Sequence, residues 1–187
     1  MPSRWEVFRK RWSEGCGSSL CPEAQRICLA RGRVPCDILF VGEAPSIAAD
    51  VVGEPFTGEI RAVMDLVIRE AGAEVFTHAF TNLVCCVPRN LEDHAKVVPP
   101  TQEAIQACQP RLQQFIALAK PRLIVAVGYY ALCALGEMQS VEGFTVPVAH
   151  ISHPATVLYS RPYNGYAFRQ LRDALAKAVA EHLTRES

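Results

Sequence analysis

The clearest buried strand of this sequence is Pro121-Arg122-Leu123-Ile124-Val125-Ala126-Val127-Gly128, an apolar run that a proline opens and a glycine closes. Shorter apolar runs at residues 37–41, 75–83 and 146–151 predict three further strands. Apolar residues at helical spacing predict helices at residues 58–72, from Thr101 onward, at 129–135 and at 166–183. Strands that alternate with helices form parallel sheets covered on both faces. The sequence therefore predicts an α/β fold, with three α/β/α layers around a central four-stranded parallel sheet.

The remaining features are those of one globular domain spanning residues 1–187. Half of the 187 residues are hydrophobic and a fifth are charged. Residues 1–36 are charged and contain cysteines, and we expect them to pack on the domain, with short helices near 5–12 and 22–30. No apolar run is long enough to span a membrane and no signal peptide opens the chain, so a cytoplasmic protein is expected. The net charge of zero still allows one basic groove for nucleic acid.

Eight cysteines are many for a chain of this kind. Without a secretion signal a disulfide framework is not expected, so the cysteines either bind a metal centre or fill the core. Cys36 and Cys133 lie in apolar surroundings that predict core positions. Four others lie at the edges of elements, where metal ligands can converge: Cys16, Cys21, Cys86 and Cys108.

Polar loops follow three of the predicted strands. Glu43 comes directly after the first strand, with Phe56 thirteen residues on; alone, this loop is typical of phosphate binding or of an ordinary connection. Asn82 lies at the end of the second strand and offers an amide donor and acceptor. His153 follows the fourth strand and is held by Pro154, as a positioned electrophile would be. Ligands of parallel sheets bind beyond the carboxyl ends of the strands, so we expect these loops to form one site.

Six short segments of the chain, taken in their order, carry a family resemblance. They are Gly42-Glu43-Ala44-Pro45, Gly53-Glu54-Pro55-Phe56-Thr57-Gly58, Thr81-Asn82-Leu83-Val84-Cys85-Cys86-Val87-Pro88, Thr101-Gln102-Glu103-Ala104-Ile105-Gln106-Ala107-Cys108, the 121–128 strand, and His153-Pro154-Ala155. Each motif alone is weak, but the ordered set resembles the uracil-DNA glycosylase superfamily. It is most similar to family 4, the iron–sulfur-containing uracil-DNA glycosylases, and the resemblance implies their fold.

The resemblance implies a monofunctional DNA repair enzyme that flips uracil out of single- or double-stranded DNA and excises it by hydrolysis, leaving an abasic site. The catalytic residues would be Glu43, which orients the attacking water or stabilises the sugar cation, and His153, which donates toward O2 of the base. Phe56 would stack on the base, and Asn82 would pair with the uracil edge.

The resemblance also implies supporting contacts. Backbone amides near Gly42 and Ala44 would help to hold the base. Ser152 and Arg161 would contact the DNA. Nothing in the sequence requires more than a monomer.

A [4Fe–4S] cluster is the cofactor that the resemblance implies. Cys86 and Cys108 match the last two ligands of the family. The first pair would be Cys16 and Cys21, although four residues separate them where the family has two. Cys28 is an alternative fourth ligand, and zinc is a lesser possibility with the same thiolates.

The segment 46–49 departs from the family, which has glycine and acids there; only Asp50 is retained. Ala49 replaces an acid that would lie near C5 of the base, which favours a roomier pocket for 5-substituted uracils or for thymine opposite guanine. Three alternatives stay open: a glycosylase for another deaminated base, a non-catalytic nucleic-acid-binding relative, and a nucleotide hydrolase, which the absence of a G-x-x-x-x-G-K-[ST] motif disfavours. The insert 90–96 is not basic, which disfavours a branch that crosslinks to DNA through a histidine, although His94 lies there.

Overall fold

The sheet is seen in a computed structural model, which describes residues 1–14, 26–90, 96–140, 144–160 and 165–183. Within these ranges the strands are Arg31–Gly32 (β1), Ile38–Gly42 (β2), His78–Asn82 (β3), Leu123–Val127 (β4) and Val148–Ile151 (β5). Their order across the sheet is β1-β3-β2-β4-β5. The four longer strands run parallel, which confirms the predicted four-stranded parallel core.

The two-residue strand β1 adds a fifth, antiparallel member that the sequence did not predict. It pairs Arg31 with Phe80 and Gly32 with Ala79 on the outer edge of β3. Two residues are too few to show the alternating pattern by which strands are predicted. β1 begins at Arg31 beside Phe80 and continues toward Ala79, so among the described residues Thr81 and Asn82 have no strand partner on that side.

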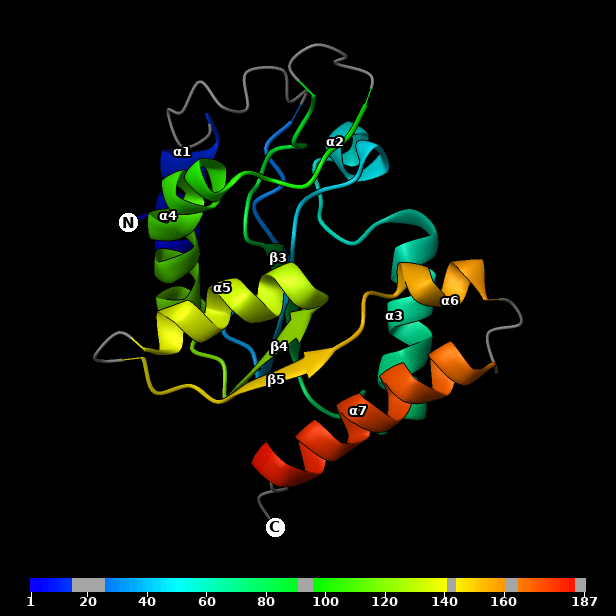
Figure 1. Cartoon of the computed structure of the whole chain (residues 1–187). Helices are drawn as coiled ribbons and strands as arrows, with labels where there is room; N and C mark the ends of the chain where they lie inside the picture. Colours follow the sequence, from blue (N-terminus) through cyan, green and yellow to red (C-terminus); the bar gives the residue numbers. More distant parts are fainter. Residues whose placement is uncertain (15–25, 91–95, 141–143, 161–164, 184–187) are drawn as a thin grey trace.

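Helices cover both faces of the sheet (Figure 1). Arg4–Trp12 (α1), Gln102–Ala119 (α4) and Tyr129–Gln139 (α5) pack on one face, and Gly58–Glu70 (α3) and Tyr166–His182 (α7) pack on the other. Alternate residues of each strand face opposite layers: Leu39 of β2 joins the first core cluster, whereas Phe40 joins the second. This arrangement confirms the predicted three layers.

Two short helices, Ile47–Val52 (α2) and Ala155–Tyr159 (α6), lie in loops that follow β2 and β5. They are too short for their apolar spacing to predict them. Ser46 begins α2 by accepting a hydrogen bond from the N–H of Ala49 at 3.2 Å, and Gly53 ends it in the left-handed conformation. Thr101 caps α4 as predicted, accepting from the N–H of Ala104.

The helix predicted near residues 22–30 is wrong over residues 26–30, which are not helical; residues 22–25 fall outside the described ranges. The backbone there bonds to distant partners instead. The N–H of Arg26 donates to the Asp50 carboxylate at 3.0 Å, and the N–H of Cys28 donates to the carbonyl of Cys85 at 2.8 Å. In the part of the chain that the structure describes, no helix is long and apolar enough to cross a bilayer.

Candidate functional site

The predicted site residues gather at the carboxyl ends of the parallel strands. We call this group the strand-end site, made of Gly42, Glu43, Phe56, Asn82 and His153. Gly42 and Asn82 are register partners at the ends of β2 and β3, and Glu43 is the next residue after β2. His153 is the second residue after β5. The three loops therefore reach one edge of the sheet, as their positions after the strands predict.

Gly42 lets Phe56 and Asn82 approach each other closely. A Cβ atom at Gly42 would lie 2.5 Å from Oδ1 of Asn82 and 2.8 Å from Cζ of Phe56. Both of these side chains are buried. Only glycine fits between them, so the amide and the ring meet over the end of β2.

The side chain of Asn82 has a buried donor that no described residue uses. Its Nδ2 is buried and has no hydrogen-bond partner among the described residues. A buried polar group left without a partner costs about 1–3 kcal/mol. Next to it, the N–H of Leu83 donates to the carbonyl of Gly42 at 2.8 Å, which keeps β2 and β3 together at their ends. The arrangement keeps an unused donor at the site, which is what recognition of a ligand requires.

Phe56 has a strained backbone that its neighbours support. Its φ is 55°, in the left-handed region that non-glycine residues rarely adopt. Nε of Arg31 donates to the carbonyl of Pro55 at 2.9 Å, and the Arg31 guanidinium lies 3.7 Å from the ring centroid of Phe80. The Phe80 ring in turn lies 5.4 Å from that of Phe56. Arg31 therefore supports both the peptide and the ring of Phe56, a role that no sequence motif indicated.

Glu43 is half-buried and unpaired within the described residues. No hydrogen bond or ion pair to its carboxylate is formed there, and burial raises the pKa of this carboxyl above its usual 4.5. A partly desolvated carboxylate without a protein partner is a stronger proton acceptor than an exposed one. Glu43 can therefore act as a base or orient a water molecule.

His153 is oriented by the helix that follows it. The N–H of Ala155 donates to Nδ1 of His153 at 3.2 Å, so in the neutral ring the proton is on Nε2. His153 keeps an exposed surface, but protein atoms around the ring partly desolvate it and lower the pKa of this imidazole below 6.5, which favours the neutral form. A Cβ atom at Gly128 would lie 3.5 Å from Cβ of His153, an ordinary contact distance, so His153 packs beside the end of β4, where the φ of 91° favours glycine. His153 can thus offer one N–H donor in a defined direction.

The other predicted contacts have different surroundings. Ala44 is half-buried against the core on the α4 and α5 side, and Ser152 is exposed. Ala49 is buried in α2, and its carbonyl accepts from the N–H of Gly53 at 2.7 Å. Asp50 is also buried and pairs with Arg89 at 3.3 Å, which connects α2 to the segment after β3. Arg161 lies outside the described residues.

Three cysteines meet beside the end of β3. Cys86 and Cys108 are buried, and both form side-chain hydrogen bonds with Cys85, whose pKa these bonds lower well below its usual value. Cys16 and Cys21 lie outside the described residues, within which no three metal-binding side chains are arranged to hold an ion. Cys28 is buried and its thiol donates to the carbonyl of Ala49 at 3.2 Å, a bond that a metal-bound thiolate would give up. Two of the four predicted thiolate ligands, Cys86 and Cys108, therefore both lie next to Cys85.

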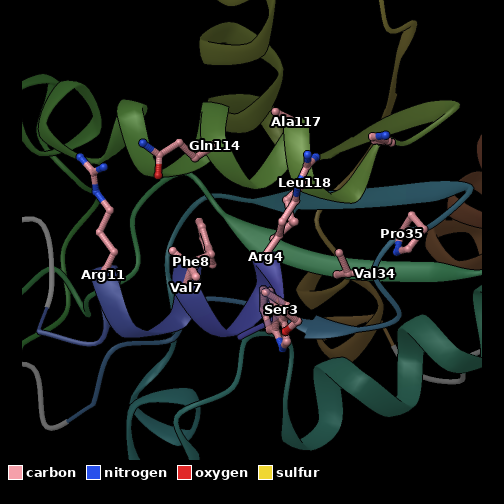
Figure 2. Close-up of a pocket in the computed structure, with 12 residues that line it drawn as sticks. Ser3, Arg4, Val7, Phe8, Arg11, Val34, Pro35, Gln114, Ala117 and Leu118 are labelled. Atoms are coloured by element: carbon pink, nitrogen blue, oxygen red, sulfur yellow. The ribbon is translucent and has the colours of Figure 1, made fainter. Parts of the chain in front are cut away.

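A separate hollow of about 560 Å³ lies between α1 and α4 (Figure 2). Its walls include Val34 and Pro35, which precede β2, and Lys120, which precedes β4. The hollow therefore lies toward the opposite ends of these strands from Gly42 and Asn82. It takes no part in the strand-end site.

Comparison with known proteins gives a consistent result. Residues 30–182 match the family described as the uracil DNA glycosylase superfamily. The chain is 28% identical over 169 residues to the type-4 uracil-DNA glycosylase of Saccharolobus solfataricus, covering 78% of this chain and 74% of the relative. It is 30% identical over 145 residues to the same enzyme of Archaeoglobus fulgidus, with coverages of 68% and 70%. It is 35% identical over 142 residues to that of Sulfurisphaera tokodaii, with coverages of 66% and 62%.

Proposed function

Because this chain belongs to the uracil DNA glycosylase superfamily, we propose that it excises uracil from DNA by hydrolysis and leaves an abasic site. One observation carries the proposal: the unused amide of Asn82 and the ring of Phe56 meet over Gly42, beside Glu43. The family match covers residues 30–182, which supports a single domain, and we expect this domain to act as a monomer.

Base recognition would follow from the amide and the ring. A glycosylase takes its target base out of the DNA stack and into the protein. The ring of Phe56 would stack on the flipped base. The Asn82 amide would accept from N3–H and donate to O4 of uracil through its unpartnered Nδ2. Cytosine presents the reversed pattern and would leave buried groups unpaired, which disfavours it strongly.

Excision would use the two polar residues on the sugar side of the base. When the bond between C1′ and N1 breaks, its electron pair leaves with the base and negative charge develops at O2. The Nε2–H of His153 would donate to that oxygen, an interaction that strengthens in the transition state. Glu43 would orient a water molecule that attacks C1′ and would accept its proton. The departing uracil takes up a proton, so the products are uracil and an abasic sugar.

The four cysteines Cys16, Cys21, Cys86 and Cys108 would hold a [4Fe–4S] cluster. Buried thiols at Cys86 and Cys108 support this, since thiolates are the ligands of such clusters. When bound, the cluster would serve structure by tying the N-terminal segment to the sheet. Iron and sulfide analysis of anaerobically purified protein tests this, with Cys133→Ser as the control and Cys108→Ser as the variant expected to lose iron. A folded wild type without iron would contradict the cluster. If that protein contains zinc, the same cysteines would hold zinc and not iron.

The substrate range is expected to extend to 5-substituted uracils. The small side chain of Ala49 stands where the family places an acid near C5, which supports this expectation. Excision of 5-hydroxymethyluracil and of thymine opposite guanine should be measured beside G:U duplexes. Activity confined to plain uracil would show that Ala49 does not widen the pocket.

The function as a whole is tested by base release from oligonucleotides that contain uracil, cytosine or hypoxanthine, both single- and double-stranded. We expect release of uracil, and a fall of about 100-fold or more in His153→Ala. His150→Ala is the matched control, since His150 is exposed in the same strand-end segment. A wild type that binds uracil-containing DNA but cuts no base would favour the non-catalytic alternative. Release of hypoxanthine alone would favour another deaminated base. The DNA contacts proposed for Ser152 and Arg161 predict weaker binding in their alanine variants.

A further inference from the structure

Arg111 is a fully buried arginine on α4 that reaches the end of β3. Its guanidinium donates three hydrogen bonds: to Oγ1 of Thr81 at 2.7 Å, to the carbonyl of Asn82 at 2.5 Å and to the carbonyl of Leu83 at 2.8 Å. The acceptors are three successive residues at the point where β3 leaves the sheet. Thr81 extends the contact, because its hydroxyl donates to the carbonyl of Leu29 at 2.7 Å.

The burial of this charge is costly and needs a reason. Removing an arginine from water costs several kcal/mol, and an apolar residue of similar size is often at least as good for stability. No carboxylate pairs with Arg111 among the described residues, and its Nε has no partner there. What the guanidinium does supply is hydrogen-bond donors at the end of β3, beyond Phe80, where β1 no longer pairs with the strand.

These bonds act on the residue that we propose reads the base. Asn82 presents its amide to the site from a peptide whose carbonyl accepts from Arg111. The side chain has few rotamers, so the position of the amide follows the position of that peptide. Arg111 also lies three residues after Cys108, on the same face of α4, so one helix carries a proposed metal ligand and the support of Asn82.

We infer that Arg111 is a positioning residue for base recognition, which fixes the main chain of Asn82 from behind and so sets the direction of its amide. This inference rests on the proposed function. A residue that only stabilised the fold would lower all activities in proportion to the loss of folded protein. A positioning residue changes the reading of the base while the protein stays folded.

A double-mutant cycle with Asn82→Ala separates these two roles. We expect Arg111→Met to lower kcat/KM on uracil about 30-fold in the wild-type background, and by less than about threefold when Asn82 is already alanine. Arg111→Lys keeps the charge and some of the bonds, so it should recover part of the loss. Equal losses in both backgrounds would overturn the inference. If Arg111→Met does not fold, Arg111→Lys completes the same cycle.

Arg122→Met is the matched control, because Arg122 pairs with Asp37 at the other end of the sheet. It should alter stability without changing kcat/KM on uracil. A loss of kcat/KM in this variant equal to that of Arg111→Met would assign both effects to stability and overturn the inference.

A second readout needs no catalysis. The chain has three asparagines, Asn82, Asn90 and Asn164, so asparagine-selective ¹⁵N labelling resolves the side-chain amide of Asn82. In Arg111→Lys we expect the Asn82 amide signals to move, whereas in the Arg122→Met control we expect them to stay in place. Unmoved Asn82 signals would overturn the inference even if the wild type excises uracil. If the wild type excises no uracil but the Asn82 signals do shift in Arg111→Lys, the proposed function is refuted. The link between Arg111 and Asn82 then still stands.

Discussion

Replacing Gly42 with alanine should damage the base site more than the fold. The added methyl carbon would lie 2.5 Å from Oδ1 of Asn82 and 2.8 Å from Cζ of Phe56, shorter by about 0.9 and 0.6 Å than the 3.4 Å at which ordinary contact begins. Overpacking of this size costs about 1–3 kcal/mol. The atoms that must move are the ends of the two side chains proposed to hold the base, so the cost should appear in transition-state binding. We therefore expect kcat/KM on uracil to fall about 5- to 150-fold.

The assay is single-turnover excision from an end-labelled oligonucleotide with enzyme in excess, followed by alkaline cleavage of the abasic site. Thermal unfolding of the same samples measures the folded fraction. Gly136→Ala is the control, because Gly136 lies in α5 with no atom within 4 Å of an added Cβ, and there alanine should stabilise the helix by about 0.5–1 kcal/mol. Excision by Gly42→Ala within about twofold of wild type would refute the close packing of Phe56 and Asn82 over Gly42. A loss of excision no larger than the loss of folded protein would refute the assignment of the effect to the base site.

Three further variants test the other residues. Asn82→Ala removes the unpartnered Nδ2, so the free energy of unfolding should rise by about 1 kcal/mol while uracil excision falls about 100-fold or more. A less stable variant would contradict the conclusion that Nδ2 has no partner in the folded protein. Burial raises the pKa of Glu43 above 4.5 and the ionised form is needed, so the single-turnover rate should fall as the pH is lowered, with a midpoint above 4.5. Glu43→Gln should lack this acidic fall in rate. If the variant keeps the same fall, another group is responsible for it. Arg31→Met removes the contacts of Arg31 with the Pro55 carbonyl and the Phe80 ring, and we expect about tenfold slower excision. The control Arg33→Met, at an exposed arginine, should excise at about the wild-type rate. Equal rates for Arg31→Met and wild type would show that Phe56 keeps its position without Arg31.

Residues that follow strand ends were predictable because their chemistry is local in the sequence. Glu43 directly follows β2, Asn82 is the last residue of β3 and His153 is the second residue after β5, and parallel strands end on one edge of a sheet. The short elements β1, α2 and α6 were not predictable, since they are too short to show a period. The helix predicted near 22–30 failed over 26–30 because Asp50 and Cys85, distant in sequence, take its backbone donors.

By itself the sequence determined the alternation of strands and helices, the residues at the strand ends and the resemblance to one superfamily. Only the tertiary structure decided that Gly42 lies between Phe56 and Asn82, and that Arg31 and Arg111 support them. Twenty or more residues separate each arginine from its partners along the chain. Strand order and side-chain direction bring them together, and neither can be predicted from a short stretch of sequence.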